Sequence, residues 1–307
     1  MTQESYIQNQ QAVMNRMHKM YEAKIYRALM GQINDAIELI KQWGADAAGR
    51  IDRVAINDEL STQILNLYRS AGTINARFVY GIIQKQIPKE KQFTPVFIYK
   101  RFGFNERWTQ IVEAYFNKFL LDKAVLPITE TTKKFILQIL SKGIQEGLGY
   151  EEIARQLRDS PITRQRARLI VRTESARATN FGGMMAAWES DFECEKFWIE
   201  VKDNRTRLTH RHSTGVGGEK VDLLSKYSNG LMFPGDPNGP AKEVCNCRCT
   251  QGFKLKRDYR GRLIPKQSVN QSGGMSIIEA LKPLQIEIFI SLLASQLFTQ
   301  ITEDNVI

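Results

Sequence analysis

Apolar residues recur every three or four positions over much of the chain, which predicts a largely helical protein. One such stripe runs through residues 13–43, and a second runs through residues 57–86 until Pro88 ends it. A third follows Pro127, from Thr129 to Gly147. This spacing is typical of one face of an amphipathic helix, so we interpret these faces as core or as docking surfaces for a partner.

Residues 95–126 are rich in aromatic side chains, with Gly103 interrupting the helical pattern and Pro127 closing it. Aromatic rings beside basic residues can stack on nucleic-acid bases. Aromatic rings at helical spacing more often form a core. We favour the core and keep base stacking as the alternative.

The segment after Gly147 resembles a helix-turn-helix. A short helix, a turn at residues 159–161 and a longer helix rich in arginine follow one another. The arginines are spread around the longer helix, whereas a recognition helix needs its donors on one exposed face. Reading of a DNA operator is therefore the weaker interpretation.

The apolar face of the longer helix contains a carboxylate, Glu174. Burying it without a partner would cost several kcal/mol, so we expect it to meet an arginine or a row of donors. Arg205 and Arg207 are the candidates. On the same helix, Gly182 and Gly183 would let another element approach the backbone closely.

Residues 198–249 interrupt the helical pattern and contain two of the three histidines and three of the four cysteines. From Lys196 the side chains alternate between apolar and polar, which predicts a strand. A polar loop and a loop rich in proline and glycine follow, and the sequence VCNCRCT reads as another strand.

The histidine and cysteines of this stretch are suitable metal ligands. A cysteine cluster in a reducing compartment usually indicates zinc or catalysis. On a regular strand, alternate cysteines would stand about 6.6–6.8 Å apart, too far for one tetrahedral ion unless the strand bends. The residues therefore leave two alternatives open, a thiol cluster without a cofactor or a zinc ion. The candidate ligands are His210, Cys245, Cys247 and Cys249.

A catalytic site would need a thiolate, a base and an orienting group in contact. Cysteine, histidine and Asp203 are present, but the sequence does not show that they meet. We predict that the chain is not an enzyme and assign no catalytic residue.

The net charge of +10 favours a polyanionic partner, because lysine and arginine release counterions from phosphates. We expect no signal peptide and no membrane-spanning segment, since neither a basic region followed by an apolar one nor a long uncharged apolar run is present. A basic strip after residue 252 supplies the candidate DNA contacts. They are Lys254, Lys256, Arg257, Arg260 and Arg262.

Together these patterns predict an α+β protein that is predominantly helical. We divide it into a helical N-terminal region (1–127), a small α+β domain with short strands (128–252), a basic linker (253–275) and a C-terminal docking helix (276–307).

The motifs of the α+β domain stand in a characteristic order and spacing. They are Arg172, Thr173, Glu174, Asn180, Gly182, Trp198, Asp203, Arg205, Thr206, Arg207, His210, Asn246, Cys247, Arg248 and Cys249. In this order they resemble the minor head (head morphogenesis) proteins of tailed phages, the family named for the Mu F protein. A histidine often precedes the NCRC element in that family, and here Cys245 stands in that region.

The resemblance implies a virion protein present in few copies, made in the host cytoplasm and then held inside the head near the portal. It implies the portal protein and other head proteins as partners, non-specific contact with double-stranded DNA, and roles in head assembly and DNA packaging or delivery. We interpret Arg172, Glu174, Asp203, Arg205 and His210 as structural, holding the helix against the loops. Composition alone would equally allow a helical DNA-binding regulator. A third alternative is a zinc- or cysteine-dependent enzyme in residues 198–249.

Overall fold

The computed structural model describes residues 2–53, 58–88, 109, 111–112, 115–117 and 119–266. The helices are α1 (Gln3–Trp43), α2 (Asp58–Gln86), α5 (Leu126–Gln145), α6 (Tyr150–Asp159), α7 (Ile162–Trp188) and α8 (Ala241–Val244). The strands are β1 (Cys194–Ile199), β2 (Lys220–Asp222) and β3 (Thr250–Leu255). Shorter turns are a 3-10 helix at Gly44–Arg53, a π-helix at Leu120–Val125 and a 3-10 turn at Leu208–His210. The predicted class, α+β and mainly helical, is confirmed.

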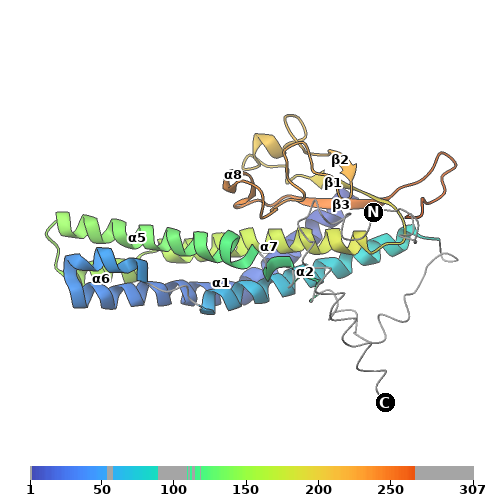
Figure 1. The fold of residues 1–307 in the computed structure, drawn as a ribbon. Helices are drawn as coiled ribbons and strands as arrows, with labels where there is room; N and C mark the ends of the chain where they lie inside the picture. The colour runs from blue at the N-terminus through green and yellow to red at the C-terminus, as the bar shows by residue number, and fades with distance from the viewer. Residues whose placement is uncertain are drawn as a thin grey trace, which may run out of the picture.

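The long helices α1, α2 and α7 lie side by side and share the main hydrophobic core (Figure 1). The stripe predicted in residues 13–43 is buried, with Met17, Ile25 and Ile33 fully inaccessible. Helix α1 begins earlier than predicted, because Tyr6 is buried against the sheet and exchanges hydrogen bonds with the backbone of Phe253. No helix in the described part of the chain is long and apolar enough to cross a membrane.

Helices α2 and α7 approach each other closely where a glycine of each meets the other. A Cβ atom added at Gly182 would lie 2.2 Å from the carbonyl oxygen of Gly72, so α7 cannot carry a side chain there unless the helices move apart. Beside it, a Cβ at Gly183 would lie 2.7 Å from the side-chain amide of Asn75. The predicted close approach at Gly182–Gly183 is confirmed.

Helices α5 and α6 pack around the far end of α1, away from the sheet (Figure 1). Pro127 was predicted to close a helix, but it lies in the first turn of α5, where its missing N–H costs nothing. The helix-turn-helix of α6 and α7 is present, but two of its arginines bind the protein itself. Arg168 pairs with Glu22 of α1, and Arg166 donates to the Ile128 carbonyl.

The sheet is antiparallel, with strand order β2-β1-β3, and it lies over α7 beside the N-terminus (Figure 1). Phe253 and Leu255 of β3 belong to the main core, whereas Trp198 of β1 belongs to a small separate core. The sheet therefore contributes side chains to both cores.

Two predictions for the chain after residue 240 are wrong. VCNCRCT is not a strand: α8 ends at Val244, Asn246 adopts a left-handed backbone conformation (φ 58°), and β3 starts only at Thr250. Residues 253–266 are not an exposed linker, because β3 continues to Leu255 and the chain then folds back to pair Phe192 with Pro265. Residues 267–275, the C-terminal segment 276–307 and most of the aromatic stretch 95–126 lie outside the described residues.

Candidate functional site

Residues 198–249, here called the loop lobe, contain only short regular elements. These are the end of β1, the 3-10 turn at Leu208–His210, β2 and α8. The lobe has its own small core, formed by Trp198, Val216, Tyr227, Leu231, Val244, Cys247 and Cys249. Polar contacts within this lobe, and between it and α7, involve most of the residues that the sequence singled out.

A buried polar network joins α2, α7 and the loop lobe at Glu174. Its carboxylate accepts hydrogen bonds from the Tyr68 hydroxyl at 2.5 Å and from Arg177 at 2.7 Å. Arg177 also donates to the Gly235 carbonyl of the lobe at 3.0 Å. We expected an arginine beside Glu174, and one is there, but it is Arg177 and not Arg205 or Arg207. Arg177 lies one turn further along the same helix, within ordinary reach of Glu174.

Burial and neighbouring charges shift the pKa values of Tyr68 and Arg177. Burial, and then the neighbouring Glu174 carboxylate, raise the pKa of Tyr68 well above its usual value. Burial lowers the pKa of Arg177, but Glu174 and Tyr68 more than offset this, and its pKa is raised overall. Arg177 therefore stays charged while only 4% of it is exposed.

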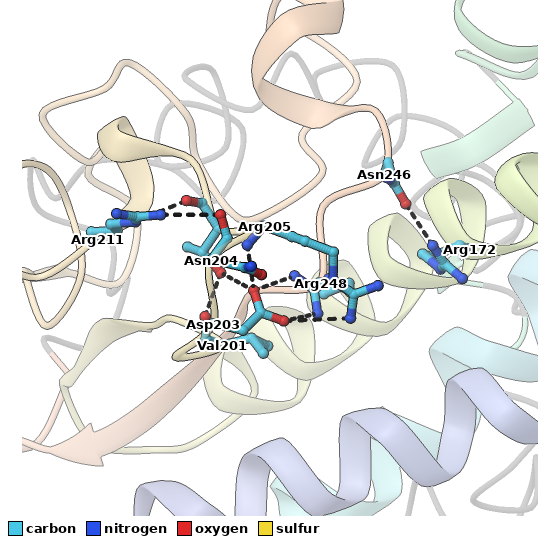
Figure 2. Close-up of polar contacts among 9 residues, drawn as sticks. Arg172, Val201, Asp203, Asn204, Arg205, Arg211, Asn246 and Arg248 are labelled. Atoms are coloured by element: carbon cyan, nitrogen blue, oxygen red, sulfur yellow. Dashed lines mark hydrogen bonds and ion pairs between the residues drawn. The ribbon is translucent and has the colours of Figure 1, made fainter.

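Before and after Glu174 and Arg177 on α7, polar side chains bind the NCRC segment. Thr173 accepts a hydrogen bond from the Asn246 N–H at 2.9 Å, and Arg172 donates to the Asn246 side chain at 2.9 Å (Figure 2). Asn180 donates to the Cys249 carbonyl and accepts from the Thr250 hydroxyl. Helix α7 thereby positions this segment from both of its ends.

A second polar cluster closes the loop that follows β1. Both terminal nitrogens of Arg248 donate hydrogen bonds to the Asp203 carboxylate, at 2.5 and 2.7 Å. The backbone N–H of Arg205 donates to the same carboxylate (Figure 2). The Arg248 hydrogen bond holds the pKa of Asp203 well below its usual range. Thr206 donates to the Val201 carbonyl and Arg207 to the Cys245 carbonyl. The Arg205 side chain itself is exposed and only loosely paired.

His210, Cys247 and Cys249 meet inside the loop lobe. His210 Nδ1 lies 3.6 Å from Cys247 Sγ and 3.7 Å from Cys249 Sγ, and the ring of Trp198 packs against the imidazole. The exposed fractions are 1% for His210, 1% for Cys247 and 3% for Cys249. The other ring nitrogen, Nε2, lies 2.9 Å from a carboxylate oxygen of Glu243.

The two thiols of this cluster differ in acidity. A hydrogen bond from Cys247, and then the nearby His210, lower the pKa of Cys249 well below its usual value. The same thiol contact, together with burial, raises the pKa of Cys247. The fourth predicted ligand does not join them: Cys245 is exposed and lies outside the cluster.

Besides Arg177, three residues of the site were missed from the sequence. Tyr68 and Glu243 lie far along the chain from their partners, and no local pattern marks them. Lys196 is fully buried, and it donates to the Met232 carbonyl at 2.6 Å. The sequence places Lys196 on the same face of the strand as Trp198, and this could have predicted its burial.

The candidate DNA contacts do not form one free basic strip. Lys256 pairs with Asp222 and Glu193, and Arg262 pairs with Asp258 at 2.8 Å. Arg257 donates to the carbonyls of Gly261 and Gln86, and Arg260 lies over the Tyr259 ring. Lys254 is exposed on β3.

A surface pocket in the loop lobe lies beside the Asp203 cluster and is lined by Glu200, Val201, Lys202, Asp203, Asn204, Arg211 and Ser213. His210, Cys247 and Cys249 are not among these lining residues. The cluster of His210, Cys247 and Cys249 is therefore separate from this pocket.

Residues 134–252 match the family described as Phage Mu protein F like protein, which confirms the resemblance inferred from the motifs. Over 118 residues the chain is 30% identical to the minor head protein GP7 of Bacillus phage SPP1. That alignment covers 37% of this chain and 38% of the relative, so it spans well under half of either protein. No solved structure matches the chain.

Proposed function

We propose that this chain, whose residues 134–252 match the phage Mu protein F like family, is a minor head protein of a tailed phage or prophage that acts in head morphogenesis. The observation that carries the proposal is the family match over the region that contains α7, β1, β2 and the loop lobe. The 30% identity to a minor head protein over 118 residues supports it.

The contacts of the motif residues support an assembly role without catalysis. Thr173 and Asn180 bind backbone groups of the NCRC segment, and Asp203 binds Arg248 of the same segment. Each contact fixes one part of the lobe against another or against α7. Such residues specify a rigid surface that a partner can recognise.

We further propose that the partners are the portal protein and other head proteins, and that the chain is placed inside the prohead near the portal. In this position it would aid DNA packaging or delivery through non-specific contact with double-stranded DNA. The net charge of +10 supports contact with phosphates. The internal pairing of Lys256 and Arg262 argues that other basic residues make such contact.

The direct test is to stop translation of this gene in the phage or prophage that carries it. We expect the chain in purified wild-type heads in few copies, and fewer infectious particles without it. Co-purification of the chain with the portal protein from the same genome would test the partner. Absence of the chain from both proheads and virions would contradict the proposal.

DNA contact requires a separate measurement. Binding to two unrelated duplexes of equal length should be equal, and its logarithm should fall linearly with the logarithm of salt concentration. A helical regulator would instead bind one duplex much more tightly and form a dimer. Equal and salt-insensitive binding, or none, would remove DNA from the proposed partners.

A further inference from the structure

We propose that His210 Nδ1, Cys247 Sγ and Cys249 Sγ bind one zinc ion, which joins the two halves of the loop lobe. This inference does not depend on the proposed function. It rests on the distances within the cluster, on the hydrogen bond to the other side of the histidine, and on the shape of the backbone between the cysteines.

The distances fit a tetrahedral zinc ion. With a zinc–nitrogen bond of about 2.0–2.1 Å, a zinc–sulfur bond of about 2.3 Å and a tetrahedral angle, the nitrogen–sulfur separation is about 3.6 Å. The two observed separations are 3.6 and 3.7 Å. All three ligand atoms lie within 4.8 Å of one another.

Glu243 orients the imidazole for metal binding. Its carboxylate lies 2.9 Å from Nε2 and can only accept a hydrogen bond from it when ionised. The proton of a neutral His210 is therefore held on Nε2, which leaves the lone pair of Nδ1 directed at the two sulfur atoms. A carboxylate bound to the far nitrogen of a histidine is the usual outer partner of a zinc ligand.

The backbone bends where the two thiols must converge. Asn246 has a φ of 58°, a left-handed conformation that breaks the strand pattern we predicted for these cysteines. Polar contacts hold the bend on both sides, because Thr173 accepts from the Asn246 N–H and Arg248 binds Asp203. The bend removes the objection that alternate cysteines on a strand stand too far apart.

The small core of the loop lobe also suggests that a cross-link or a bound metal stabilises it. Its core consists of few side chains, and its regular elements are three or four residues long apart from the end of β1. Small cores of this kind are commonly stabilised by disulfides or by a structural metal. Residues 210 and 247 are 37 positions apart, so an ion between them would close a long loop. Among the described residues the cluster supplies three of the four ligands that a tetrahedral zinc ion takes.

The same atoms could instead form a cysteine–histidine–glutamate nucleophile, in which Glu243 orients His210 and His210 activates Cys249. Burial argues against it, since at most 3% of any of the three ligands is accessible to a substrate. A metal needs no such access once it is bound.

The test is the zinc content of the purified full chain, measured by mass spectrometry without added chelator. We expect about one zinc per chain. Replacing either sulfur ligand (Cys247→Ser or Cys249→Ser) should reduce zinc at least tenfold. Cys245→Ser removes a neighbouring thiol outside the cluster and should leave zinc unchanged. A folded wild-type chain without zinc, which also takes up none when zinc is added, would overturn the proposal.

A second variant separates loss of zinc binding from unfolding of the lobe, which the ligand substitutions could also cause. Glu243→Gln keeps all three ligands and should weaken zinc affinity about 10–100-fold, as measured by competition with a chromogenic chelator. The Cys247 and Cys249 thiols of the wild-type chain should resist alkylation until the zinc is removed. Alkylation of Cys249 at the same rate with and without zinc would favour the nucleophile and contradict the metal site.

Discussion

The helical layer and the loop lobe are held together in different ways. Helices α1, α2 and α7 share one large apolar core, in which polar side chains are exceptions. The loop lobe has a small core and depends on hydrogen bonds from α7, an ion pair between Asp203 and Arg248, and the His210 cluster. A helix can be specified by its own apolar stripe, whereas this lobe needs particular atoms from distant parts of the chain.

This difference determines what a single substitution does. A large apolar core tolerates changes that preserve its volume. A polar network does not tolerate the loss of one partner, because the partner that is left behind stays buried and unpaired. Substitutions in the polar networks should therefore cost more than volume-preserving substitutions in the apolar core.

The largest effect is expected at Glu174, where both regions meet. Glu174→Ala leaves the Arg177 guanidinium buried without its carboxylate, and breaking a buried pair of this kind costs roughly 3–5 kcal/mol. The measurement is the free energy of unfolding in denaturant. The control is Glu22→Ala, which removes a more exposed pair with Arg168 and should cost less than about 1 kcal/mol. Equal losses of unfolding free energy in the two variants would show that the buried network around Glu174 stabilises the fold no more than an exposed ion pair does.

The helical layer should be most sensitive where α2 and α7 touch. Gly182→Ala places a methyl group against the Gly72 carbonyl and should cost about 1–3 kcal/mol, as overpacking does. Gly81→Ala lies in α2 with no atom within 4 Å of the added carbon, so it should be neutral or stabilise by roughly 0.5–1 kcal/mol. Thermal unfolding measures both. A Gly182→Ala protein as stable as the wild type would mean that the helices can separate without cost.

Lys196, buried between the sheet and the lobe, should make stability depend on pH. Burial lowers its pKa to about 7, from 10.5 in the unfolded chain. Between pH 7 and 9 the unfolded chain therefore binds more protons at this site than the folded one, and the free energy of unfolding should rise with pH, by about 2 kcal/mol.

Comparison with Lys196→Met isolates this contribution. The variant should lose that part of the rise, whereas Lys266, whose pKa is lowered to about 8, adds a rise of the same sign to both proteins. Measurements should stop near pH 9, because burial raises the pKa of Cys194 to about 12 and its contribution has the opposite sign above that range. Lys220→Met, at an exposed position of β2, is the control. Identical pH profiles for Lys196→Met and the wild type would contradict the prediction.

The smallest effect is expected at Asn246, inside the loop lobe. Alanine is disfavoured at a φ of 58°, so Asn246→Ala should cost about 1–2 kcal/mol. Asn246→Gly accepts the same conformation and should cost less, although it also loses the contact with Arg172. The order of the two variants in denaturant unfolding tests whether the bend matters. Equal costs for the two variants would assign the effect to the lost contact with Arg172 and not to the backbone bend.

The sequence predicted the helical layer well because its signals are local. The stripes in residues 13–43 and 57–86 correspond to α1 and α2, and the double glycine correctly predicted a close approach. The π-helix before α5 and the place of Pro127 in its first turn were missed, since proline is compatible with both the end and the start of a helix.

The loop lobe was predicted less well because its structure depends on contacts between distant residues. Residue types correctly suggested that His210 and the cysteines belong together. They did not reveal that the chain turns at Asn246, so the strand was wrong and Cys245 was included in the cluster. Glu174 was correctly expected to meet an arginine, but a partner one turn away on the same helix was overlooked in favour of Arg205 and Arg207.

We propose that specific polar contacts and a zinc ion at His210, Cys247 and Cys249 hold the loop lobe, independently of the apolar core of the helices. The decisive measurement is amide hydrogen exchange of the full chain, followed by mass spectrometry before and after removal of zinc with a chelator. We expect residues 198–249 to lose protection while α1, α2 and α7 keep theirs. An unchanged exchange pattern, or a loss of protection over the whole chain at once, would contradict the claim.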